Sequence, residues 1–123
     1  MVDFKLRLHP NVLFAYSQNH VEVIVRLENR GTEPAWCEAE VKVPDGISLS
    51  PAGPLSKGRL RLGIVIKKEY LEKAVRIFAN NYTAPQIYRA LFTLFVFNKD
   101  GVIEKRIEKP IDIRCEIKKE EVL

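Results

Sequence analysis

Apolar and polar residues alternate along most of this 123-residue chain, and clusters of turn residues interrupt the alternation repeatedly. In residues 21–28, for example, Val21, Val23 and Val25 fall on one side and mainly charged residues on the other. A period of two is typical of a half-buried β-strand, because successive side chains of a strand point to opposite faces. The 12 Val and 11 Ile strengthen this prediction, since β-branched side chains pack well on a pleated surface.

The alternation predicts about seven strands in one domain spanning residues 1–123. They are expected near residues 4–8, 21–28, 35–43, 59–66, 73–80, 88–97 and 102–117. The run 88–97 is apolar on both faces, which indicates a central strand covered on two sides. Such a series predicts an all-β fold, with an immunoglobulin-like β-sandwich of about seven antiparallel strands as the architecture.

Residues 67–78 allow two interpretations. Tyr70, Ala74 and Phe78 fall at helical spacing, so one short helix near residues 67–78 is one alternative. Val75 and Ile77 alternate as in a strand, and the neighbouring segments are predicted strands. We favour a turn followed by a strand from about residue 73.

Two segments resemble a known family. Residues 21–32 consist of a strand followed by Asn29-Arg30-Gly31-Thr32, and residues 41–46 end a strand with Pro44-Asp45-Gly46. These segments resemble the CARDB-type immunoglobulin-like modules of archaea and bacteria. The resemblance implies a β-sandwich that docks partners or glycans, and it brings no catalytic residues.

The sequence offers no membrane-spanning segment, since no apolar stretch reaches about 18 residues. Its beginning lacks the apolar region of a secretory signal, so a cytoplasmic location is expected. In that compartment the sequon Asn81-Tyr82-Thr83 is expected to be an unmodified loop. Scarce Gln and abundant Lys, Glu, Ile and Val are typical of a thermophile.

Residues with metal-binding or catalytic chemistry are few and scattered. Cys37 and Cys115 fall on the apolar sides of strands that should lie two apart in one sheet, too far for a disulfide, so two buried free thiols are expected. No Cys-x-x-Cys pair suggests a metal site, and His9 and His20 are expected at strand ends on the surface. We therefore predict a protein that is not an enzyme and has no cofactor or metal.

Positive charge is concentrated in residues 57–76, where seven basic and two acidic residues give a net charge of +5, against +4 for the whole chain. The basic residues are Lys57, Arg59, Arg61, Lys67, Lys68, Lys73 and Arg76. A basic edge of this kind would suit nucleic acid or an acidic partner. It would equally protect an edge strand from pairing with another chain.

Three aromatic residues are expected away from the core. If Cys37 points inward, then Trp36 points outward, and Phe95 and Phe97 occupy the outer side of a neighbouring strand. Such a patch would mark a surface for a protein partner or for a homodimer, unless another segment covers it. The leading functional hypothesis is therefore a non-enzymatic protein-interaction module, and the alternative is a nucleic-acid accessory protein that uses the basic edge.

Overall fold

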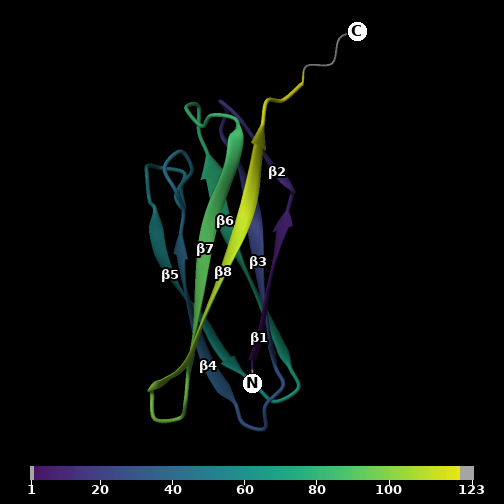
Figure 1. The fold of residues 1–123 in the computed structure, drawn as a ribbon, viewed down its shortest axis with the longest axis vertical. Coiled ribbons are helices and arrows are strands. Elements are labelled where there is room, and N and C mark those ends of the chain that lie inside the picture. The colour runs from purple at the N-terminus through teal and green to yellow at the C-terminus, as the bar shows by residue number, and fades with distance from the viewer. Residues whose placement is uncertain (1, 120–123) are drawn as a thin grey trace.

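The computed structural model describes residues 2–119, which form eight β-strands and no helix (Figure 1). The predicted all-β fold class is therefore confirmed. The strands are β1 (Val2–His9), β2 (Val12–Phe14), β3 (Asn19–Asn29), β4 (Ala35–Lys42), β5 (Lys57–Val65), β6 (Tyr70–Ala79), β7 (Gln86–Phe97) and β8 (Ile103–Glu116).

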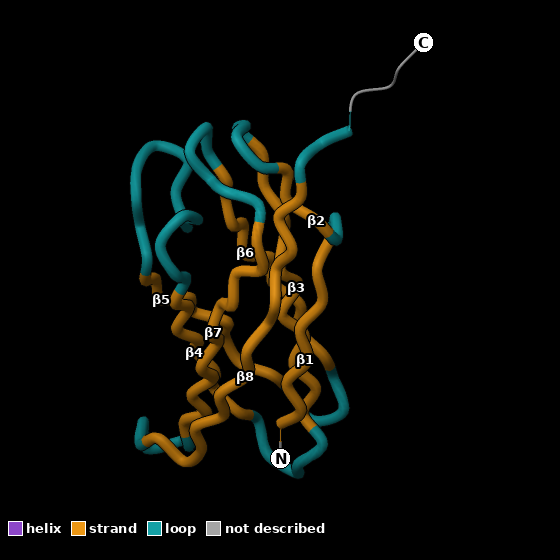
Figure 2. The backbone as a smooth tube through the Cα atoms, turned by 45° about the horizontal axis from the view of Figure 1, so that its top comes forward, coloured by secondary structure: helices purple, strands orange, loops and turns teal. Residues whose placement is uncertain are grey.

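The strands are arranged in two sheets (Figure 2). One sheet has the order β1-β3-β6, and the other, which is curled like half a barrel, has the order β2-β8-β7-β4-β5. All neighbours are antiparallel except β2 and β8, which run parallel. The predicted count of seven strands omitted β2, whose three residues gain a ladder only by pairing with the distant end of β8.

The core lies between the sheets and follows the alternation of the sequence. On β3 the residues Val21, Val23 and Val25 are all fully buried, and on β7 so are Phe92 and Leu94. As predicted, β7 is central, because it pairs with β4 on one side and β8 on the other. Its second face is also apolar and half-buried.

The helix considered for residues 67–78 does not form. Residues 67–68 make a turn, and β6 begins at Tyr70, three residues earlier than expected. Its whole length pairs with β3, which places Val75 opposite Val23 and Ile77 opposite Val21. Apolar contacts with a neighbouring strand therefore outweigh the helical spacing of the segment.

The alternation of β5 changes side at a β-bulge. The pairing of β4 with β5 shifts after Cys37, so that Leu62 is an extra residue, and the adjacent Gly63 has a φ of 111° that favours glycine. Beyond the bulge Val65 is buried, whereas Ile64 is 58% exposed. Leu60, Leu62, Ile64 and Ile66 alternate in the sequence as if they shared one face of the strand, but the bulge turns Ile64 to the other face.

The last strand also differs from its prediction. A proline within a predicted strand, here Pro110, favours an interruption, but β8 continues through that residue, which lies opposite Leu91. Pro110 is tolerated because the other side of β8 is paired with β2 only at residues 114–116. The irregularity of this pair lies instead after Val96 of β7.

The two cysteines are free and buried, as predicted. Cys37 lies opposite Val96, and Cys115 lies opposite Gln86, at the other end of β7. These two positions on β7 are ten residues apart, which corresponds to about 33 Å along the strand. The cysteines are therefore separated along the strand direction as well as across the sheet, where the sequence already placed them two strands apart. Burial raises the pKa of the Cys37 thiol to about 11 and raises that of Cys115 as well.

The connection between β6 and β7 is held to the rest of the molecule by two hydroxyl groups. The hydroxyl of Tyr88, near the start of β7, donates a 2.7 Å hydrogen bond to the carbonyl of Ala84. The hydroxyl of Thr83 donates a 2.7 Å hydrogen bond to the carbonyl of Gly46. Thr83 is completely buried, so this residue of the sequon has a structural role.

Replacing Tyr88 by phenylalanine is expected to reduce the free energy of unfolding by about 1 kcal/mol, because it removes one buried hydrogen bond and keeps the ring. The melting temperature should fall by about 3 to 5 °C in a thermal scan followed by circular dichroism. Tyr82→Phe is the matched control, since Tyr82 is 89% exposed and should melt like the parent. Equal melting temperatures for the parent, Tyr88→Phe and Tyr82→Phe would show that the Tyr88 hydrogen bond does not contribute to the stability of the fold.

Candidate interaction surface

The outer face of the five-stranded sheet carries a row of large apolar side chains across four strands. Trp36 of β4 lies opposite Ile64 of β5 on one side and opposite Phe97 of β7 on the other, and Phe97 lies opposite Ile103 of β8. We call these four residues the apolar row. Trp36 is 39% exposed, Ile64 58% and Ile103 52%, while Phe97 is half-buried between its neighbours.

The structure places two of the three predicted aromatic residues in this row. Trp36 and Phe97 are direct cross-strand partners, whereas Phe95 lies one row away, opposite Glu38. Ile64 and Ile103 were missed by the sequence interpretation. Ile64 faces outward only because of the bulge at Leu62, for which the glycine within the strand at position 63 is the sequence signal.

A shallow hollow of about 660 Å³ adjoins the apolar row. Its apolar wall consists of Trp36, Ile64 and Phe97 together with Pro34 from the β3–β4 loop. Polar groups from the β7–β8 hairpin, including Lys99, border its other side. The side chains of the row therefore offer both a projecting surface and a recess for a partner.

Charged side chains border the other side of the row. The guanidinium of Arg59 lies 5.2 Å from the ring centre of Phe95, and that of Arg106 lies 6.0 Å from it. Glu38 pairs with Arg59 at 3.4 Å and accepts a 3.4 Å hydrogen bond from the indole nitrogen of Trp36. The surface thus has an apolar part and a polar border, the usual composition of a protein–protein interface.

The outer face of the three-stranded sheet is different in character, because ion pairs cover it. Glu72 lies 3.1 Å from Arg7 and 3.0 Å from Arg26, and these hydrogen bonds hold the pKa of its carboxyl below the usual value. Arg76 pairs with Glu22 at 3.3 Å on the same face. Tyr70 of β6 is 60% exposed on this face, with the guanidinium of Arg26 3.9 Å from its ring centre. The face therefore carries an exposed aromatic residue among ion pairs, whereas the five-stranded sheet carries a row of apolar side chains.

The structure divides the predicted basic edge between two sheets. Three of the residues lie on β5, in the five-stranded sheet: Lys57, Arg59 and Arg61. Two lie on β6, in the three-stranded sheet: Lys73 and Arg76. Lys67 and Lys68 lie in the turn between the two strands. Three of the seven have acidic partners, since Lys57 pairs with Glu40 at 3.1 Å, and Arg59 and Arg76 pair as described above. The charge is therefore less concentrated in space than along the sequence.

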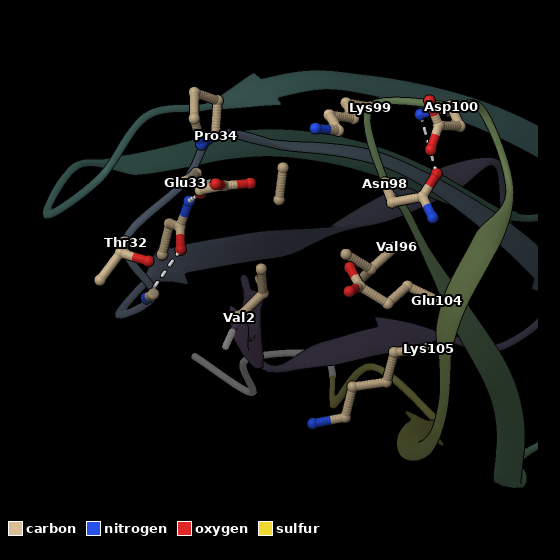
Figure 3. Close-up of a pocket in the computed structure, with 13 residues that line it drawn as sticks. Val2, Thr32, Glu33, Pro34, Val96, Asn98, Lys99, Asp100, Glu104 and Lys105 are labelled. Atoms are coloured by element: carbon tan, nitrogen blue, oxygen red, sulfur yellow. Dashed lines mark hydrogen bonds between the residues drawn. The ribbon is translucent and has the colours of Figure 1, made fainter.

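A second hollow, of about 600 Å³, lies at the end of the molecule where the β3–β4 loop and the β7–β8 hairpin meet (Figure 3). Val2 and Val96 are apolar parts of its lining, and Glu104 and Lys105 of β8 are charged parts. Asn29 also lines it, but all the polar atoms of its side chain are hydrogen-bonded within the protein. The lining therefore combines apolar side chains with charged groups of both signs.

Other kinds of site are not found among the described residues. Within residues 2–119 no group of three or more His, Cys, Asp or Glu side chains is placed to hold a metal ion. None of the described residues forms a helix of the length and apolar character needed to cross a membrane.

No protein-family model matches the sequence, and no curated protein is significantly similar to it.

Proposed function

We propose that the protein is a non-enzymatic interaction module that binds a protein partner, or a second copy of itself, through the outer face of its five-stranded sheet. The apolar row carries this proposal. Its residues come from four adjacent strands, and three of them are more than one-third exposed. Contiguous apolar surface of this kind is uncommon on monomeric proteins and typical of binding sites, in which Trp contributes a large share of the affinity.

We further propose that the fold is immunoglobulin-like. The strand orders support this classification, because β4, β7 and β8 share one sheet and β3 and β6 share the other, as in that fold. The bond from the hydroxyl of Tyr88 to the carbonyl of Ala84 supports it too, since it has the position of the tyrosine corner. We propose a relationship to CARDB-type modules on the basis of residues 21–46, in which two strands end at Asn29-Arg30-Gly31-Thr32 and at Pro44-Asp45-Gly46.

The substitution Trp36→Glu tests the function, because it places a carboxylate at the centre of the apolar row. If two copies pair, light scattering will show a mass that rises with concentration, and the variant will need at least about 30-fold more protein to associate. If the partner is another protein, affinity capture from the native source will recover it with the parent and not with the variant. Tyr82→Glu is the matched control, because it adds the same charge at a distant exposed site.

Two results together would contradict this function. They are a parent that remains monomeric at every concentration, and a set of captured proteins that is the same for the parent and for Trp36→Glu. Circular dichroism must show that the variant is folded, which is expected because Trp36 is 39% exposed.

Nucleic-acid binding is the second candidate and has less support. Its basis is the net charge of residues 57–76, which the structure divides between two sheets. Binding to nucleic acid that weakens steeply as salt rises would favour it over the apolar row.

A further inference from the structure

Among residues 2–119, no backbone group pairs with the outer edge of β5. β5 is the last strand of the five-stranded sheet and lies at the left of the molecule in Figure 1. The amide of Val43 donates a 2.8 Å hydrogen bond to the carbonyl of Ser56, which makes these two residues a hydrogen-bonded pair. In the antiparallel register of β4 and β5, the backbone N–H and C=O groups of every second residue of β5 therefore point toward β4. The backbone groups of Gly58 and Leu60 accordingly point toward β4. The groups that point away from the sheet belong to Lys57, Arg59 and Arg61, and we call these three residues the β5 edge.

Features that block strand pairing are present at the other main edges. On β8, Pro110 lacks an amide hydrogen. On β1, the carbonyl of Phe4 already accepts a hydrogen bond from the ammonium group of Lys109. On β6, Lys73 lies opposite the buried Val25 and places a charge on the core side of the strand. By contrast, the core-side residues next to the β5 edge are uncharged: Gly58 and Leu60.

The charge of the β5 edge determines what can pair with it. All three side chains are cationic, exposed and on the outer side of the sheet. An antiparallel second copy of β5 would place cations opposite cations, which destabilises a cross-strand pair. An acidic strand would place carboxylates opposite them. Arg61 has no ion-pair partner in the part of the chain that the structure describes.

We propose that the β5 edge binds an extended segment of a partner protein in which acidic and apolar residues alternate, and that this segment becomes a sixth strand of the sheet. The acidic residues face Lys57, Arg59 and Arg61 on the outer side. The apolar residues of the segment fall on the core side, where they contact Leu60 and Leu49, which pack against the core. Gly58, next to Leu49, has no side chain that would obstruct them. Backbone hydrogen bonds give this binding mode its affinity, and side chains at alternate positions give its specificity.

The first test measures binding of a fluorescein-labelled peptide of four Val-Glu repeats by fluorescence anisotropy. A peptide of four Val-Lys repeats is the control for charge. The parent should bind the acidic peptide at least about tenfold more tightly than the basic one. The double variant Arg59→Glu/Arg61→Glu should reverse this preference, and it is expected to fold because both side chains are exposed.

The second test locates the peptide by amide hydrogen exchange, measured residue by residue by NMR. In the free protein the amides of Gly58 and Leu60 should already be protected. Saturation with the acidic peptide should slow exchange at Lys57, Arg59 and Arg61 by about tenfold or more, because these amides become hydrogen-bonded. Trp36→Glu should bind the peptide as the parent does, which separates this inference from the apolar row.

Either of two results would overturn the inference. One is the absence of any difference in affinity between the acidic and basic peptides. The other is binding of the acidic peptide without slower exchange at the β5 edge, which would indicate attraction between charges without strand pairing.

Discussion

Phe92→Asp is expected to abolish the folded state of the protein. Phe92 is fully buried at the centre of β7, and removal of a buried Phe side chain costs about 3 to 5 kcal/mol. An unpaired carboxylate in the core costs several kcal/mol more. The sum approaches or exceeds the whole stability of a typical domain, about 5 to 15 kcal/mol. Circular dichroism and urea titration should show no cooperative unfolding transition. Val23→Asp should give the same result, because Val23 is also fully buried.

Ile87→Asp is the control for this experiment. Ile87 is on the same strand and is 64% exposed, so the same carboxylate there should leave cooperative unfolding intact. A Phe92→Asp variant that is soluble and unfolds cooperatively would show that the faces of β7 have been assigned the wrong way round.

Asn29→Ala is expected to reduce the free energy of unfolding by about 2 to 4 kcal/mol, because it leaves three backbone groups without their partner, one of them buried and two partly buried. The side-chain nitrogen of Asn29 donates to the carbonyls of Glu33 at 2.8 Å and Val65 at 2.9 Å, and its oxygen accepts from the amide of Gly31 at 2.9 Å. The side chain therefore connects the end of β3 to the β3–β4 loop and to the end of β5. Urea denaturation should show a lower midpoint with an unchanged slope.

The same substitution in the β7–β8 hairpin serves as the control. The side-chain oxygen of Asn98 accepts hydrogen bonds from the amides of Asp100 and Val102, but these bonds are exposed to water. Asn98→Ala should therefore cost less than half as much as Asn29→Ala. Equal losses would mean that burial of Asn29 contributes nothing to the strength of its hydrogen bonds.

Local patterns predicted those parts of the fold that depend on neighbouring residues. The alternation of Val21, Val23 and Val25 identified the buried face of β3, and Trp36 was correctly placed on the outer face of β4. The residues Asn98-Lys99-Asp100-Gly101 are typical of a hairpin turn, and the backbone bonds of this segment are those of a hairpin. In each case the determining interactions lie within a few residues of one another.

Other parts depend on contacts between distant residues, and sequence patterns did not predict them. The face of Ile64 depends on the register between β4 and β5, which changes at a single extra residue. β2 is a strand only because the end of β8 lies beside it. Similarly, the seven basic residues are close in sequence, but the chain passes from one sheet to the other between β5 and β6 and so separates them.

The parallel pairing of β2 with β8 has a consequence for synthesis of the chain on the ribosome. β2 is Val12–Phe14 and its partner is at residues 114–116, so this ladder forms only after the intervening residues have been made and residues 114–116 have left the exit tunnel. Before then β7, with both faces apolar, has a free edge where β8 will add. An unpaired apolar strand attracts other chains, so the nascent protein is most prone to aggregate until β8 has left the exit tunnel and paired with β7.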